Sequence, residues 1–191
     1  MTAQAHDGFL WQNGEYLLVG VDGGRLFDLR EHGFETRPTT TANWRGWVAR
    51  YGIIEDQLLL VELRDVGLWV EPGDPPPVLR GVEGILEGHS YRFHGLVWPL
   101  DFSGRLLIAR GFIQSLYRHM GFHPAWKFEE AWQLEINEGR LVEAHDTSDE
   151  MRATREKIGS DEAADPDDVT RPGWIARTFR LSFNRSKIDG D

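Results

Sequence analysis

The sequence predicts a mainly β protein with about 8–10 antiparallel strands, either closed as a barrel of the lipocalin-like cup type or folded as a two-layer sandwich. Several stretches alternate apolar and polar residues, which is typical of strands with one face in a core and the other in water. Acidic or glycine-containing turns separate pairs of these stretches, as in hairpins. We expect closure because an open sheet would expose apolar edges. One short capped helix near 148–158 is the exception to the β pattern.

The composition is compatible with a single β-rich domain spanning residues 1–191. Of the 191 residues, 40% are hydrophobic and 8 are tryptophan, which is enough for one sizeable core. The absence of cysteine excludes disulfide bonds and zinc–thiolate sites. No stretch of about 18 apolar residues occurs, and the N-terminus lacks the basic-then-apolar layout of a signal peptide. We therefore expect a cytoplasmic protein with no membrane partner.

The charge balance bears on the kind of partner. The chain carries 21 Lys and Arg against 31 Asp and Glu, a net charge of −10 at pH 7. Such a charge repels phosphates, so no nucleic acid partner is expected. Surplus acid suits a basic protein partner, and ordinary solubility explains it equally well. The phosphate-loop, dinucleotide-binding, hydrolase-elbow and zincin signatures are all absent, so no cofactor is expected.

The first half of the chain predicts two hairpins. Apolar residues occur on both faces of the second one, which indicates strands covered on each side or a barrel strand touched outside by the helix. The expected order is a loose polar segment at 1–14, a hairpin of Glu15–Val21 and Arg25–Leu29 around Asp22–Gly24, a loop at His32–Thr41, and a hairpin of Val48–Ile54 and Gln57–Leu63 around Glu55 and Asp56.

The second half begins at a proline-rich break and ends in a change of period. Three consecutive prolines favour an extended rod, and a Thr-Ser-Asp-Glu capping box starts the helical pattern. The expected order is the break Glu71–Pro77, a β segment Val78–Leu86, a strand pair Tyr91–Trp98 and Gly104–Phe112, an ordered loop Phe112–Ala125, the hairpin Trp126–His145, the helix Met151–Ile158 with Gly159 at its end, a mobile acidic loop at 160–171, a closing strand Trp174–Phe183 and a disordered tail at 184–191.

The predicted core depends on the hairpin Trp126–His145. Its first strand alternates strictly, and the residues expected to face inward are Trp126, Phe128, Trp132, Leu134 and Ile136. A two-residue turn at Glu138-Gly139 sets the register. It pairs Ile136 with Leu141, Leu134 with Glu143, and Trp132 with His145.

This register places three polar residues on the apolar face, namely Glu130, Glu143 and His145. Because a buried carboxylate is costly unless it is paired, one interpretation is that the face reaches the rim there or that an arginine neutralises the acids. Arg110 shares that face and is the natural partner, as a structural ion pair or a substrate clamp. The other interpretation is a tryptophan-lined ligand cavity with acid and base groups. A slip of one residue would move the polar groups of the return strand outside.

Two further motifs supply candidates. The corner Trp44-Arg45-Gly46-Trp47 is either a structural stack of an arginine between two tryptophans or the mouth of a cavity for an anionic or planar ligand. His119 and His123 stand four apart, as metal ligands on one helical face do, but the nearby glycine and proline argue against a helix, and no metal is expected. The predicted ligand-binding residues are Trp44, Arg45, Arg110, Tyr117, His119 and Trp132, and the candidate catalytic residues are Glu130, Glu143 and His145.

The phrases TANWRGWVARYGIIEDQLLLVEL, SGRLLIARG and YRHMGFHPAWKFEEAWQLEINEGRLV carry a resemblance. Together they resemble a widespread bacterial family that has a Trp-Arg-Gly-aromatic corner, a Ser-Gly strand and a Tyr-x-His-Met-Gly segment. The resemblance covers about residues 40–145 and implies no established activity, cofactor or partner. The positions that it marks are Trp44, Arg45, Gly46, Gly104, Tyr117, His119, Met120 and Gly121, whereas His123 lies outside the pattern.

Two hypotheses of function from different classes remain. The leading one is a non-enzymatic, acidic bacterial module that binds another protein, as an immunity-type or regulatory partner does. The alternative is a small-molecule-binding or hydrolytic β-barrel with a cavity lined by Trp, Arg, His and Glu. A filled interior with an exposed patch favours the first, and a solvated cavity holding the polar residues favours the second. A homodimer is compatible with either.

Overall fold

The computed structural model describes residues 2–71, 73–160 and 181. Within them the chain is mainly β, with nine strands in one large sheet, two short strands in a second sheet, and one α-helix. No helix in these ranges is long and apolar enough to cross a membrane. The elements are β1 (Gly8–Trp11), β2 (Gly14–Asp22), η1 (Leu29–His32), β3 (Val48–Ile54), β4 (Gln57–Val66), β5 (Val78–Leu79), β6 (Val82–Glu83), β7 (Ile85–Glu87), β8 (Ser90–Pro99), β9 (Gly104–Phe112), η2 (Gln114–Leu116), η3 (Ala125–Lys127), β10 (Phe128–Asn137), β11 (Arg140–Asp146) and α1 (Ser148–Ser160).

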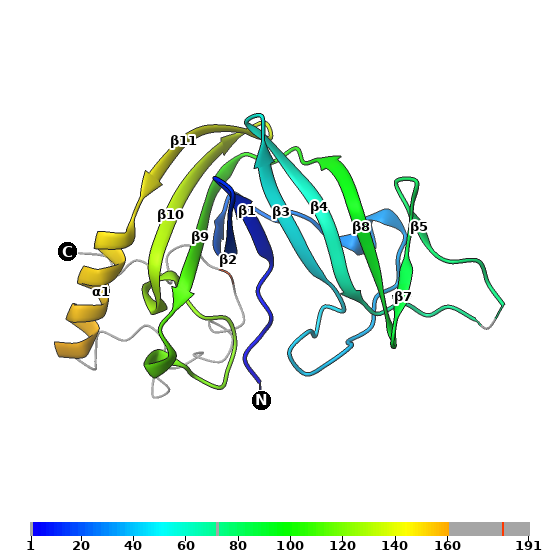
Figure 1. Cartoon of the computed structure of the whole chain (residues 1–191), viewed down its shortest axis with the longest axis horizontal. Coiled ribbons are helices and arrows are strands. Elements are labelled where there is room, and N and C mark those ends of the chain that lie inside the picture. The colour runs from blue at the N-terminus through cyan, green and yellow to red at the C-terminus, as the bar shows by residue number, and fades with distance from the viewer. Residues whose placement is uncertain (1, 72, 161–180, 182–191) are drawn as a thin grey trace.

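The strands of the large sheet follow the order β11-β10-β9-β2-β1-β3-β4-β8-β7. A further pairing of Arg140 on β11 with Gln57 on β4 returns the order on itself, and β8 and β7 continue beyond this ring. Figure 1 shows the result as a strongly curved sheet with α1 at one end and β7 and β8 at the other. The predicted mainly β class with one short helix is confirmed. The sheet is mixed, however, because β1 runs parallel to β3, so the expectation of a purely antiparallel sheet is wrong at this pair.

The N-terminal segment differs from the prediction. Residues 8–11 form β1, not a loose segment, and Phe9 and Trp11 are buried. Gln12 and Asn13, with φ of 47° and 61°, turn the chain into β2, as in a two-residue hairpin. The predicted partner strand at Arg25–Leu29 is absent from this part of the chain, because the Asp28 carboxylate accepts a hydrogen bond from the Arg30 backbone and starts η1.

Strands β8 and β9 both form where predicted, but they do not pair with one another. β8 pairs with β4 and β7, whereas β9 lies between β10 and β2. The segment that connects β8 to β9 contacts β4 and the β10–β11 turn. Leu100 donates its backbone N–H to the Leu58 carbonyl over 3.0 Å, and the Phe102 carbonyl accepts from Gly139 over 2.8 Å. These bonds carry the chain across the ring instead of folding it into a hairpin.

The interior is filled by apolar side chains. The inward face of the predicted central hairpin is as expected at its middle, since Leu134 is fully buried and Trp132 packs against the core, but Ala131 on the opposite face is buried too. A second cluster lies between the sheet and α1, where Met151 packs near Trp126 and Ala131. The Thr147 hydroxyl fixes the start of α1 by donating to the Ala131 carbonyl over 3.2 Å. The predicted helix is confirmed at 148–160.

One predicted surface residue is buried. The alternation of Trp126–Ile136 puts Lys127 among the polar, outward positions, but η3 turns it inward, where it is 1% exposed and its ammonium lies 4.9 Å from the centre of the Trp126 ring. The predicted acidic loop at 160–171, the closing strand Trp174–Phe183 and the tail at 184–191 lie outside the described residues, apart from residues 160 and 181.

Candidate functional site

The register of the β10–β11 hairpin decides where its polar residues lie. Ile136 pairs with Leu141, as predicted, and the two-residue turn at Glu138-Gly139 forms. A bulge at Val142 then shifts the ladder by one residue, so that Glu143 pairs with Glu135 and His145 with Gln133. The interpretation that places Glu143 and His145 on the apolar face is therefore wrong.

The two residues instead form an exposed pair on the outer surface of β11. His145 Nε2 lies 3.1 Å from Glu143 Oε1, and their side chains are 51% and 56% exposed. Both side chains are in contact with water and lie outside any enclosed site.

Glu130 does lie on the inner side of β10, and both of its carboxylate oxygens accept hydrogen bonds. Arg110, directly opposite on β9, donates Nε–H to Glu130 Oε2 over 2.6 Å. The Tyr16 hydroxyl and the Trp132 indole both donate to Oε1, over 2.6 and 3.0 Å. The predicted ion pair of Glu130 with Arg110 is confirmed. Glu130 is therefore neutralised by an arginine, as the first of the two interpretations predicts.

The environment of Glu130 keeps it ionised. Burial alone would raise the pKa of the Glu130 carboxyl, but the hydrogen bonds from Tyr16, Arg110 and Trp132 outweigh burial and lower it. Burial and the hydrogen bond to Glu130 raise the pKa of Tyr16 to about 12. A general acid needs a raised carboxyl pKa, so this group behaves as a structural anion.

The Trp44–Trp47 corner anchors the N-terminal segment. The Arg45 guanidinium donates to both carboxylate oxygens of Asp7 and lies 4.0 Å from the centre of the Trp47 ring. Asp7 is 2% exposed and also accepts a hydrogen bond from the Ala49 backbone over 2.6 Å. Burial would lower the pKa of Arg45, but the Asp7 charge outweighs it and raises that pKa. Arg45 is therefore neutralised within the fold.

The predicted stack at this corner forms on one side only. Trp47 is buried beneath Arg45, whereas Trp44 is 59% exposed. Gly46 adopts a φ of 84°, and a Cβ there would lie 2.3 Å from the Arg37 carbonyl oxygen. This close approach explains the glycine of the corner.

Tyr117 and His119 lie together on the exposed loop after η2. The Tyr117 hydroxyl and His119 Nδ1 are 3.0 Å apart. His123 is buried nearby, with its ring 5.3 Å from that of Tyr117. Among the described residues, no group of three His, Asp or Glu side chains could hold a metal ion.

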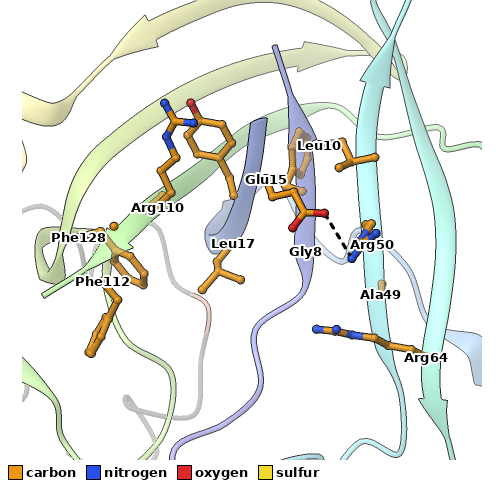
Figure 2. A pocket seen from close by; sticks show the side chains of 14 residues that line it. Gly8, Leu10, Glu15, Leu17, Ala49, Arg50, Arg64, Arg110, Phe112 and Phe128 are labelled. Atoms are coloured by element: carbon orange, nitrogen blue, oxygen red, sulfur yellow. Dashed lines mark ion pairs between the residues drawn. The ribbon is translucent and has the colours of Figure 1, made fainter. Parts of the chain in front are cut away.

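A groove of ≈ 290 Å³ lies elsewhere, across the β1–β2 hairpin. Of the predicted site residues, only Arg110 contributes to it. Figure 2 shows Arg50 on β3 and Arg64 reaching in from β4 on one side, and Phe112 and Phe128 on the other. The groove is lined by Gly8, Phe9, Leu10, Glu15, Tyr16, Leu17, Ala49, Arg50, Arg64, Ala109, Arg110, Gly111, Phe112 and Phe128.

A line of alternating charges runs beside this groove. Glu62 on β4 is 1% exposed; Arg92 donates to it over 2.6 Å, and Arg50 Nε lies 3.5 Å from its second oxygen. Arg50 also reaches Glu15 over 3.7 Å. Burial would raise the pKa of Glu62, but Arg92, His94 and Arg50 outweigh it and lower it. Sequence reasoning missed this set, although Arg50 and Arg64 could be found on the polar positions of the second predicted hairpin.

No family model, curated protein or solved structure matches this chain. Two surfaces in the described part of the chain are candidates for binding, namely the groove and the free end of the large sheet.

The free end of the sheet is β7. Within the described residues β7 pairs with β8 alone, so its other edge is open. Ile85 and Leu86 are 59% and 60% exposed, although both are large and apolar. Exposed acids flank them at Glu83 and Glu87. The opposite end differs, because β11 also pairs with β4.

Proposed function

We propose that this protein is a non-enzymatic, acidic binding module that acts by contact with another protein at the open edge of β7. The observation that carries the proposal is the exposure of Ile85 and Leu86 on a strand that, among the described residues, is paired on one side only. An open strand edge presents unpaired N–H and C=O groups, which can pair with an added strand. Exposed apolar side chains beside that edge supply the buried area that such a contact needs.

The contacts of the candidate catalytic and ligand-binding residues support a role without catalysis. Glu130 is held as an anion by three donors, and Glu143 with His145 forms an exposed pair on the outer surface. Arg45 is occupied by Asp7. A hydrolytic site needs a nucleophile beside a base, and these groups do not supply that arrangement.

The chemistry of the partner follows from the charge of this surface. Glu83 and Glu87 flank the apolar residues, and the chain as a whole carries a net charge of −10. A matching partner offers an extended apolar segment with basic residues beside it. This is the chemistry of an acidic immunity-type or regulatory protein, and we place the proposed contact in the cytoplasm of a bacterium, with no cofactor involved.

Paired variants test the proposal. We suggest a double variant, Ile85→Lys with Leu86→Lys, and a control, Val142→Lys, which alters an equally exposed residue on β11 (58%). Each is tagged and used to capture proteins from its own source cells, with quantification by mass spectrometry. We expect the wild type and the control to capture the same basic protein and salt to release it. The double variant should capture at least about tenfold less of that protein. Identical captured sets for all three proteins would refute the edge as the contact.

A second candidate function, binding of a small molecule, is favoured by the groove across the β1–β2 hairpin, whose volume of ≈ 290 Å³ is near the lower end for ligand sites.

A further inference from the structure

We infer that the groove across the β1–β2 hairpin binds a small organic monocarboxylate, with the carboxylate held by Arg64 and Arg50 and the apolar body against Leu17, Phe112 and Phe128. This inference is independent of the protein contact proposed at β7. It starts from an arginine that the fold leaves without a counter-charge.

Arg64 is that arginine. It is exposed and lines the groove from β4, and its side chain makes no hydrogen bond or ion pair with any other residue in the described ranges. Figure 2 shows its side chain extending from the strand toward the middle of the groove. Two arginines nearby are occupied, Arg92 by Glu62 and Arg110 by Glu130. The groove therefore has one uncompensated positive charge in a chain that is otherwise strongly acidic.

Arg50 supplies a second donor to the same space. Its Nε faces the buried Glu62, but its Nη2 points to Glu15, whose side chain is 76% exposed and lies 3.7 Å away. A contact of this length to an exposed acid contributes little. A ligand carboxylate can replace Glu15 there, since guanidinium groups bind carboxylates through paired N–H donors.

The other side of the groove is mainly apolar, and Arg110 on that side is paired with Glu130. Leu17 and Phe112 are partly buried, Phe128 is buried, and Figure 2 shows both phenylalanines across the groove from Arg50 and Arg64. A ligand that spans the groove therefore presents a charged end to β3 and β4 and an apolar end to β9 and β10. Small-molecule sites commonly combine an apolar lining with a few placed polar groups in this way.

The charge count favours one negative charge on the ligand over two. Among the described residues that line the groove, Arg64 is the single cation without a counter-charge, while Glu15 and the ionised Glu62 lie on either side of Arg50. A dianionic phosphate would meet these two carboxylates with only one free guanidinium to offset them. The geometry accordingly favours a carboxylate attached to a body of one or two rings.

The experiment uses naphthoate as the probe, with naphthamide as its neutral analogue and naphthyl phosphate as its dianionic one. Calorimetric titration of the full chain measures affinity, and amide NMR shifts locate the site. Naphthoate is expected to bind and to shift Gly8, Leu17 and Gly111. Arg64→Gln should weaken binding about tenfold or more, Glu15→Gln should strengthen it about threefold, and Arg152→Gln on α1, whose side chain is 60% exposed, should leave it unchanged.

Equal affinity for naphthamide, an unchanged affinity in Arg64→Gln, or shifts centred on another part of the molecule would overturn the inference. Tighter binding of naphthyl phosphate than of naphthoate would overturn the assignment to a monocarboxylate. Because Arg64 and Glu15 are exposed, neither variant should alter the fold, and far-ultraviolet circular dichroism verifies this.

Discussion

Arg110 and Glu130 occupy directly opposite positions on β9 and β10, and the Arg110 Nε donates to a Glu130 oxygen over 2.6 Å. The pair joins two strands of the ring where the tryptophan-rich hairpin meets the core. Tyr16 on β2 and Trp132 on β10 donate to the same carboxylate. The Glu130 carboxylate therefore accepts hydrogen bonds from side chains on three strands, and its charge stabilises the fold.

Replacing Glu130 by Ala should destabilise the protein by about 1–3 kcal/mol, because three donors lose their acceptor. Urea unfolding measures this change in the free energy of unfolding. Glu129→Ala is the matched control, since Glu129 is exposed on the opposite face of the same strand, and should change stability by no more than about 0.5 kcal/mol. Equal stabilities for the two variants would show that Glu130 is not a structural acceptor.

The Tyr16 phenol should titrate at about 12, above the ordinary value of 10.0, because burial and Glu130 favour its neutral form. Since this pKa is raised on folding, the stabilisation is present below pH 10.0 and is lost as the pH rises toward about 12. Ultraviolet absorbance of wild type and Tyr16→Phe across alkaline pH gives the test. The difference between the two titration curves is the titration of Tyr16. If this difference has its midpoint near 10.0, the contact with Glu130 is contradicted.

Glu62 should make the protein sensitive to acid. Its folded pKa lies below the ordinary value of 4.5, because Arg92, His94 and Arg50 outweigh burial. The stabilisation is thus present above pH 4.5 and is lost as the pH falls through the folded pKa. Glu62→Gln should be less stable at neutral pH and should lose less stability on acidification. Parallel losses in wild type and variant, measured by urea unfolding at several pH values, would exclude this role.

Asp7 and Arg45 should be strongly coupled. Asp7→Ala leaves a largely enclosed guanidinium without its counter-ion, and such losses cost about 3–5 kcal/mol. Adding Arg45→Met to that variant should recover part of the loss, because the unpaired charge is removed. A double-mutant cycle by thermal and urea unfolding measures the coupling, and strictly additive effects would argue against the pair as the anchor of the corner.

The sequence was sufficient for features that depend on alternation along one strand. It predicted the β3–β4 hairpin, the two-residue turn at Glu138-Gly139 and the pairing of Arg110 with Glu130, because shared faces follow from spacing. The short helix was predicted equally well from its capping box and composition.

Features that depend on contacts between distant strands could not be predicted. β1 is only four residues long, which is too short for alternation to indicate a strand, and besides its hairpin with β2 it pairs in parallel with β3 some forty residues later, a contact that no local pattern indicates. The bulge at Val142 leaves the turn intact and yet reverses the faces of Glu143 and His145. Nothing in the local sequence distinguishes Arg64 from other polar strand residues. Its place beside the groove depends on β1, β2 and β9, which are distant in the sequence.

Hydrogen–deuterium exchange on the complex with the captured partner tests the proposed function most directly. In the free protein, the outward amides of Ile85–Glu87 should exchange rapidly, because β7 is paired on one side only within the described residues. Partner binding should protect β7 and leave β11 unchanged. Protection that is absent from β7, or that falls on the groove or on β11 instead, would contradict a contact through the open edge of the sheet.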